Sequence, residues 1–294
     1  MLTSSMGEPR MNNIAASASV DDLPFVRIEA NASHRGLGLR ELWDYRELLY
    51  FLVWRDVKVR YKQTAIGASW ALLQPLLTMV IFTMVFGKFA KMPSNGLPYP
   101  IFTFVALLPW NYFARSLNQS ILSVVGNANL ITKVYFPRLL LPLSAVVSGL
   151  IDLAIGFGFL IVMMLWYQIT PDWEILYLPL FIMLAMLTAL SVSLWLAVIN
   201  VRYRDVGQAV PFLIQIWLFV SPVAYAVSVV PSQWRMLYSL NPMAGVIEGF
   251  RWALTTSESP PVLSVAISTV MVLALLYGGL IFFKRMEETF ADVI

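Results

Sequence analysis

Long segments without any charged residue are the feature that most constrains this chain. They occupy residues 63–87, 92–114, 153–171, 175–201, 206–234 and 259–283. A helix needs about 20 mostly apolar residues to cross the hydrocarbon core of a bilayer, and these segments have that length. Only 13% of the residues are charged and 59% are hydrophobic, whereas roughly a quarter are charged in an ordinary soluble domain. The sequence therefore predicts an all-α integral membrane protein.

We expect six transmembrane helices, joined by mostly short loops. The predicted spans are residues 67–89, 100–125, 142–167, 176–199, 208–227 and 261–283. Before them come a flexible cytoplasmic tail at 1–38 and a helix at 39–62, so that the transmembrane domain covers 63–294.

The distribution of Lys and Arg predicts the orientation of the spans, because cytoplasmic loops carry an excess of these residues. On one side lie the cluster that ends at Lys62 and four later positions or pairs, Lys133, Arg138, Arg202 with Arg204, and Lys284 with Arg285. This side is expected to be cytoplasmic. Both termini are then cytoplasmic.

The segment 39–62 has apolar residues at helical spacing, among them Leu42, Trp43, Leu49, Tyr50 and Val53. This pattern indicates an amphipathic helix that lies in the headgroup layer. The alternative is a helix that packs on soluble protein.

Several kinds of catalytic and metal site are excluded by composition. The chain has no cysteine, and His34 is its one histidine. Thiolate sites, disulfides, a His-rich zinc site and a Ser-His-Asp triad are therefore not expected. The phosphate-loop pattern GxxxxGK[ST] does not occur, so no catalytic residue, metal or cofactor is assigned to this chain, and energy for any transport must come from another protein.

Between the fifth and sixth spans, residues 231–256 contain two apolar pieces on either side of Asn241 and Pro242. Each piece is too short to cross a membrane. Short helices enter a membrane only where protein or water satisfies their ends. We therefore expect a re-entrant helical hairpin on the outer side, with Asn241 capping its second helix. The alternative is an ordinary structured outer loop.

Two charged residues fall within predicted spans, Arg115 in the second and Asp152 in the third. An unpaired ion in hydrocarbon is costly, and a rise of about 1.5 Å per residue puts both at similar depth. Our hypothesis is an ion pair that joins the two helices. The alternative is that each residue faces a wet cavity separately.

Aromatic residues gather toward the predicted outer half of the protein. Trp and Tyr often anchor helices at membrane interfaces, but flat aromatic faces also stack on the CH faces of sugars. The candidates for lining a sugar conduit are Trp110, Tyr112, Phe113, Trp217, Phe219, Tyr225, Trp234, Tyr238, Phe250 and Trp252.

Five blocks in this order carry a family resemblance: RDVKVRYKQTAIGASWALLQPLL, LPYPIFTFVALLPWNYFARSL, GNANLITKVYFPRLLLPLSAV, NVRYRDVGQAVPFLIQIWLFVSPVAY and SLNPMAGVIEGFRWAL. Together they resemble the membrane subunit of bacterial ABC exporters for polysaccharides such as O-antigen, capsule and teichoic acid. The resemblance implies a permease in the bacterial inner membrane, present as a homodimer with two copies of a separate ATP-binding subunit that uses ATP and Mg. No nucleic-acid partner is expected for this chain.

The resemblance also implies roles for particular loops. The loop 127–138 would be the coupling loop that docks on the ATP-binding subunit through Lys133, Tyr135, Phe136 and Arg138. The loop with Arg202, Arg204 and Asp205 would be a lesser contact. The cluster before the first span, Arg55, Lys58, Arg60 and Lys62, would attract the diphosphate of a lipid-linked polysaccharide at the inner leaflet.

The resemblance thus implies a channel-forming subunit that exports lipid-linked polysaccharide, with O-antigen as the first expectation. Two alternatives stay open. One is an ABC exporter of another lipid or of a drug. The other is an integral membrane transferase that acts on lipid-linked sugars, and this would need acids or bases clustered at one membrane face.

Overall fold

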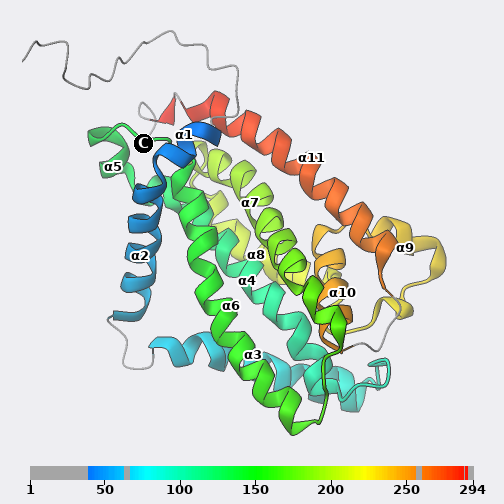
Figure 1. Ribbon diagram of the computed structural model, residues 1–294. Coiled ribbons are helices and arrows are strands. Elements are labelled where there is room, and N and C mark those ends of the chain that lie inside the picture. Colours follow the sequence, from blue (N-terminus) through cyan, green and yellow to red (C-terminus); the bar gives the residue numbers. More distant parts are fainter. Residues whose placement is uncertain (1–38, 63–66, 256–259, 288, 291–294) are drawn as a thin grey trace, which may run out of the picture. The chain divides into compact units, whose positions relative to one another are not determined.

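All regular secondary structure in the described residues is helical, which confirms the all-α prediction (Figure 1). The computed structural model describes residues 39–62, 67–255, 260–287 and 289–290. These belong to one unit, Gly36–Ile294. The predicted tail at 1–38, with His34, lies outside the described residues.

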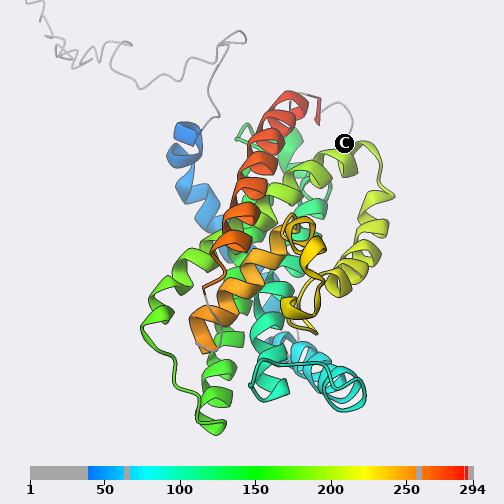
Figure 2. The same cartoon turned by 90° about the vertical axis from the view of Figure 1, so that its right-hand side faces the viewer.

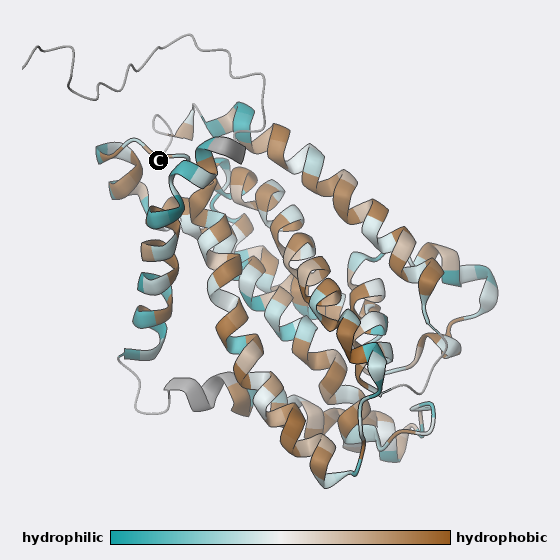
Figure 3. Cartoon of the chain, viewed as in Figure 1, coloured by the Kyte–Doolittle hydropathy of each residue, from teal (hydrophilic) through white to brown (hydrophobic). Residues whose placement is uncertain are grey.

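Four stretches of helix are long and apolar enough to cross a membrane. The first is Leu72–Phe89, where α3 (Gly67–Phe82) continues into the π-helical η2 (Thr83–Phe89). The others are α6 (Leu140–Trp166), the 3₁₀ turn η3 (Trp173–Tyr177) with α7 (Leu178–Arg202), and α11 (Val262–Glu287). Figure 3 shows apolar residues along α6, α7 and α11.

The central helix α4 (Tyr99–Gly126) corresponds to the predicted second span but is less apolar than these four. It packs against α6, α7 and α10, and most of its residues are buried (Figure 1). A helix that is surrounded by other helices of the same protein needs less apolar sequence than one surrounded by lipid. Its position in the core therefore explains how α4 keeps several polar residues.

Helix α8 (Val206–Val220) ends seven residues before the expected end of the fifth span at Val227. The next two residues are Ser221 and Pro222. A proline disfavours helical backbone in the residue before it, and Ser221 is extended, with φ −96° and ψ 153°. Residues 221–227 carry no charged side chain, so the prediction from charge-free length extended the fifth span across this break.

The N-terminal segment forms two helices, α1 (Leu39–Asp44) and α2 (Arg46–Lys62), in place of the single helix expected over 39–62. Helix α2 packs against α6 (Figure 1) and buries Leu52. Its outward side presents the exposed aromatic side chains of Tyr50, Phe51 and Trp54. Both faces of α2 are mixed: Lys58 and Lys62 are also exposed, and the side that packs on the protein combines Leu52 with Arg55, Asp56 and Arg60.

The segment after α8 contains the turn η4 (Val227–Val229) and two short helices, α9 (Ser232–Tyr238) and α10 (Pro242–Thr255). All residues of α10 except Trp252 are buried. Figure 2 shows α10 beside α11, and the two helices are in contact.

The N–H groups at the start of α10 have hydrogen-bond partners. The Met243 N–H donates to Asn241 Oδ1 (3.1 Å) and the Gly245 N–H donates to Ser268 Oγ (3.1 Å). A short buried helix requires such partners, because its first N–H groups have no acceptor within the helix. In addition, the side chain of Arg251 donates to the carbonyl of Val223 (2.9 Å) and so ties α10 to the segment after α8.

Gly249 allows α10 to approach α7 closely. A Cβ at this position would lie 2.3 Å from Cδ1 of Phe181, whose side chain is itself buried. We expect Gly249→Ala to destabilise the fold by about 1–3 kcal/mol, because the added methyl overpacks the contact. Thermal unfolding of the purified protein in detergent measures this. The matched control is Gly158→Ala in α6, where a Cβ meets nothing within 4 Å; equal melting temperatures for the two variants would contradict the prediction.

Candidate functional site

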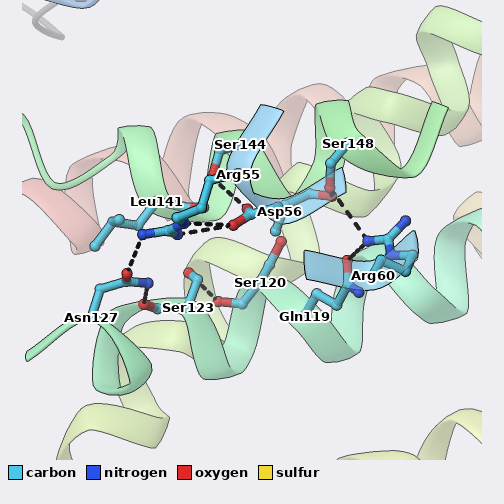
Figure 4. A network of polar contacts seen from close by, with 11 residues as sticks. Arg55, Asp56, Arg60, Gln119, Ser120, Ser123, Asn127, Leu141, Ser144 and Ser148 are labelled. Carbon is cyan, nitrogen blue, oxygen red and sulfur yellow. Dashed lines mark hydrogen bonds and ion pairs between the residues drawn. The ribbon is translucent and has the colours of Figure 1, made fainter. Parts of the chain in front are cut away.

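A network of polar contacts joins α2 to α4 and α6 (Figure 4). At one end of it, Arg55 Nη1 donates to Asn127 Oδ1 (2.8 Å), just after α4, and Arg55 Nη2 contacts Asp56 Oδ1 (2.9 Å). The other carboxylate oxygen of Asp56 accepts from Ser144 Oγ in α6 (3.3 Å). Two adjacent charged residues of α2 are thereby bound to two different helix ends.

Farther along α2, the network centres on Asp152 of α6. Its carboxylate pairs with Arg60 and accepts a hydrogen bond from Tyr61, both from α2. Arg115 of α4 adds a second ion pair, with its Nη1 3.0 Å from Asp152 Oδ2. The same Arg60 also donates to Gln119 of α4 (Figure 4). One carboxylate thus ties three helices together.

The structure brings together Arg115 and Asp152, the two charges that were predicted to meet within the spans. Arg60 joins them from the cluster that was expected to attract a lipid diphosphate. Arg60 and Asp152 are largely buried. The low effective dielectric of such a site strengthens an ion pair and makes loss of one partner costly. Arg60 could not be recognised as the third member from sequence alone, because it is 92 residues from Asp152 along the chain.

The four cations of the cluster before the first span have different surroundings. Arg55 and Arg60 are held by the network, whereas Lys58 and Lys62 are exposed. The two lysines remain accessible to an anion outside the fold. The two arginines have protein partners.

Beside Asp152 lies an open cavity of ≈ 240 Å³ between α3, α4 and α6. Its lining combines polar side chains with a few apolar ones. The polar and charged residues that line it are Gln74, Asn111, Tyr112, Arg115, Asn118, Gln119 and Asp152.

The loop expected to couple to an ATP-binding subunit begins with a short helix, α5 (Ala128–Lys133). Lys133 and Tyr135 are exposed, and 71% of the Tyr135 surface is accessible. Phe136 is only 3% exposed and packs in a core cluster with Leu140 and Phe283. The adjacent aromatics were expected to act together as anchors for a partner. The fold instead buries one of them and presents the other.

Arg138, from the same loop, is bound to the end of α11. Its main-chain N–H donates to Glu287 Oε1 (2.7 Å), and its guanidinium contacts the Glu287 carbonyl. Of the four residues expected to contact an ATP-binding subunit, Lys133 and Tyr135 are therefore exposed, whereas Phe136 is buried and Arg138 is bound to Glu287.

The second loop keeps Arg202, Arg204 and Asp205 exposed, as a docking surface requires. Tyr203 between them is also exposed and lies under the guanidinium of Arg202, 5.9 Å from it. Sequence reasoning passed over this tyrosine. Tyr203 could have been recognised in the sequence as an aromatic residue in a charged loop, the same pattern that made Tyr135 a candidate.

The expected conduit aromatics fall into two groups. Trp110, Tyr112, Phe113 and Phe250 are buried in the core, and Tyr112 also borders the cavity beside Asp152. The physical reason is that α4 and α10 are surrounded by other helices, which periodicity alone does not reveal. The members that are exposed or partly exposed are Trp217, Phe219, Tyr225, Trp234, Tyr238 and Trp252.

Long apolar helices around a buried charge network define a multi-pass membrane protein. The model of the family described as ABC-2 type transporter matches residues 47–255. This range is more than half of the chain and contains the charge network, the loop 127–138 and α10. The chain belongs to the ABC-2 type transporter family.

Relatives from several bacteria match nearly the whole chain. The chain is 31% identical over 261 residues to an O-antigen export system permease protein RfbA of Myxococcus xanthus, covering 87% of this chain and 98% of the relative. It is 26% identical over 250 residues to an RfbA protein of Klebsiella pneumoniae, covering 84% and 95%. It is 22% identical over 242 residues to the polysialic acid transport protein KpsM of Escherichia coli, covering 80% and 91%.

The Asp152 network predicts strong coupling between α2 and α6. We expect Asp152→Asn to lower the free energy of unfolding by about 3 kcal/mol, because it leaves two buried or half-buried guanidinium groups without their counter-ion. Arg60→Gln removes the other side of the pair, so the double variant should cost clearly less than the sum of the two single changes. Thermal unfolding in detergent of the wild type, the two single variants and the double variant measures the coupling between the two side chains.

The control for this cycle is Glu47→Gln, an exposed charge on the same helix α2. It should leave the melting temperature unchanged. Additive costs for Arg60→Gln and Asp152→Asn would show that the two side chains do not act as a pair.

Proposed function

We propose that this protein is the membrane-spanning permease subunit of an ATP-driven exporter that moves lipid-linked polysaccharide, most simply O-antigen, across the bacterial inner membrane. The observation that carries this is the match over 87% of the chain to a protein named as an O-antigen export permease, within the ABC-2 type transporter family. Two further relatives are named for export or transport of polysaccharides. ATP is hydrolysed by a separate subunit, since this sequence has no phosphate-loop pattern.

The permease has six spans, with α4 and α8 added to the four apolar helices. Burial of α4 among its neighbours and the position of α8 between two loops support this count. The hairpin of α9 and α10 re-enters the membrane from the outer side. Support comes from the full set of hydrogen-bond partners at the start of α10, which lets a 14-residue helix end in a medium without water.

Both termini are cytoplasmic. The contact between Arg138 and Glu287 supports this, because it brings the loop before α6 to the end of α11. The exposed cations of these loops then lie on the side that the excess of Lys and Arg marks as cytoplasmic. Lys58 and Lys62 face outward from α2 and attract the lipid diphosphate there.

The exporter contains two copies of this chain, which meet through α3 and α8. Both helices expose large apolar residues, including Leu77 and Ile81 on α3 and Phe212 and Ile216 on α8. The C-terminal ends of the two helices adjoin, since the rings of Phe82 and Phe219 are 6.2 Å apart. Exposed apolar side chains on two such helices suit a self-complementary two-fold interface.

Cross-linking tests the dimer, and the chain has no cysteine that would interfere. The pair Leu77→Cys and Phe212→Cys, in membranes treated with a flexible bis-maleimide, should give a covalent dimer because α3 of one copy meets α8 of the other. Leu273→Cys on the exposed side of α11 is the control and should stay monomeric. A dimer band that is equally strong for the control, or absent for the pair, would contradict this interface.

The ATP-binding subunit docks on the exposed residues of α5 and the loop after it. Tyr135 is the aromatic anchor and Lys133 a flanking charge, and the loop of Arg202 to Asp205, with Tyr203, provides a second contact. An exposed tyrosine in an otherwise polar loop is typical of an interface hot spot. ATP-driven movement of the partner is transmitted through these loops to α4, α6 and α7.

Reconstitution tests the function. Vesicles that contain this chain and the ATP-binding subunit encoded beside it should transfer lipid-linked polysaccharide in the presence of ATP. Tyr135→Ala should weaken binding of that subunit at least about tenfold and reduce export to match, with the fold unchanged. Phe136→Ala should instead lower the free energy of unfolding by about 3–5 kcal/mol, because it empties a buried site.

The contrast between the two neighbouring substitutions makes this test specific. Binding of the ATP-binding subunit is measured by co-purification, and folding by thermal unfolding. ATP-dependent transport of a drug without any polysaccharide transfer would overturn the substrate. Chemical alteration of the glycan without an ATP-binding partner would favour the transferase alternative.

A further inference from the structure

One stripe of the core helix α4 remains unburied, and this stripe is polar. Between Asn111 and Leu122 the residues that are not buried recur at helical spacing, three or four apart, on one side of the helix. They are Asn111, Ala114, Arg115, Asn118, Gln119 and Leu122. Four of the six are polar or charged.

This stripe differs from the exposed sides of the other long helices. Exposed positions on α11, such as Val262, Val270 and Leu273, are apolar, as expected of surfaces that face lipid tails. Amides and a guanidinium facing hydrocarbon would each be costly. The unburied side of α4 is therefore suited to water or to a polar ligand.

The stripe lines the cavity beside Asp152, opposite Gln74 of α3 and Gly156 of α6. Since Arg115 and Asp152 are both near the middle of long helices, the cavity lies far from the ends of α4 and α6. A water molecule fills about 30 Å³ of liquid, so ≈ 240 Å³ holds several waters or a group the size of a sugar ring.

Two amides that line this cavity have unused hydrogen-bonding capacity. Asn111 Nδ2 is buried and has no hydrogen-bond partner among the described residues. Asn118 Nδ2 donates to Ala114 O of its own helix (2.9 Å), which fixes the amide and leaves its Oδ1 to accept from a ligand. The two amides are seven residues, or about two helical turns, apart on one side of α4, so they match two different hydroxyls of a glycan, each of which both donates and accepts.

The charges add a preference for certain sugars. The groups joined around Asp152 are the two guanidinium groups of Arg60 and Arg115 and the single carboxylate, so the cluster has an excess of one positive charge. Such a site favours neutral or anionic glycan and disfavours cationic glycan. The pair with Asp152 also holds Arg115 in place at the cavity wall.

Resting on the proposed export function, we propose that Gln74, Asn111, Arg115 and Asn118 form a glycan-contacting wall of the transport conduit. In this role the amides exchange hydrogen bonds with passing sugar hydroxyls. The Asp152 network is the positioning device behind the wall. The buried aromatics Trp110 and Phe113 pack within the core, whereas Tyr112 borders the cavity with its hydroxyl donating to the Val146 carbonyl (3.1 Å).

Cysteine labelling of the complete exporter in vesicles tests this proposal, using the absence of native cysteine. Single variants Asn111→Cys and Asn118→Cys should react with a charged, water-soluble thiosulfonate reagent, because thiolate forms only where water is present. Leu273→Cys should not react. Lipid-linked polysaccharide extracted from the producing cells, arrested in the complex with a non-hydrolysable ATP analogue, should slow the labelling of both wall positions.

Export rates supply the second readout. Asn118→Leu should lower the export rate about fivefold, the effect of losing one hydrogen bond of about 1 kcal/mol. Thr269→Val on α11, which also removes a polar group from a long helix, should not change export. Thermal unfolding confirms that both variants are folded.

The outcomes separate this proposal from the export function itself. If the wild-type complex exports no polysaccharide, the proposed function fails. If it exports but the wall cysteines react no faster than Leu273→Cys, or react without protection by the arrested polysaccharide, the wall proposal is overturned while the export function stands. Unchanged export by Asn118→Leu would overturn it equally.

Discussion

Much of this structure depends on the ion pairs and the hydrogen bond that the Asp152 carboxylate forms with its neighbours. This carboxylate lies near the middle of a long apolar helix, where a lone charge is expensive, and it binds Arg60 and Tyr61 of α2 and Arg115 of α4. A buried ion needs its partners, so this one residue fixes the position of α2 beside α6. The turn of α4 that carries Arg115 and Gln119 is held by the same requirement.

The same rule, that polar groups away from water must be satisfied, shapes the segment after α8. Helix α8 ends at Val220, and the carbonyls that follow are bound by Arg251 and by the hydroxyl of Tyr99. Asn241 caps α10 and also accepts from Trp217 Nε1 (3.0 Å). The buried short helix, the loop before it and α8 therefore form one hydrogen-bonded assembly. Movement of α10 would require these bonds to be exchanged together.

Packing also divides neighbouring residues between structural and functional roles. Tyr135 and Phe136 are adjacent in the chain, yet one is exposed and the other belongs to the core. On α4, Asn111 lines the cavity whereas the preceding Trp110 is buried in the core. In both places the surface that a substrate or partner can reach is narrower than composition suggests, and it is set by which face the surrounding helices leave open.

The sequence by itself determined the all-α class, the approximate positions of the long helices and the family, and it put Arg115 and Asp152 at similar depth without deciding whether they pair. These follow from local signals: charge-free length, helical rise and collinear motifs. Only the tertiary structure decided that α2 lies against α6, that Arg60 joins Asp152, and that the aromatics of α4 are core while its amides line a cavity. The physical reason is that burial and long-range pairing depend on neighbours distant in the chain, which one sequence does not specify.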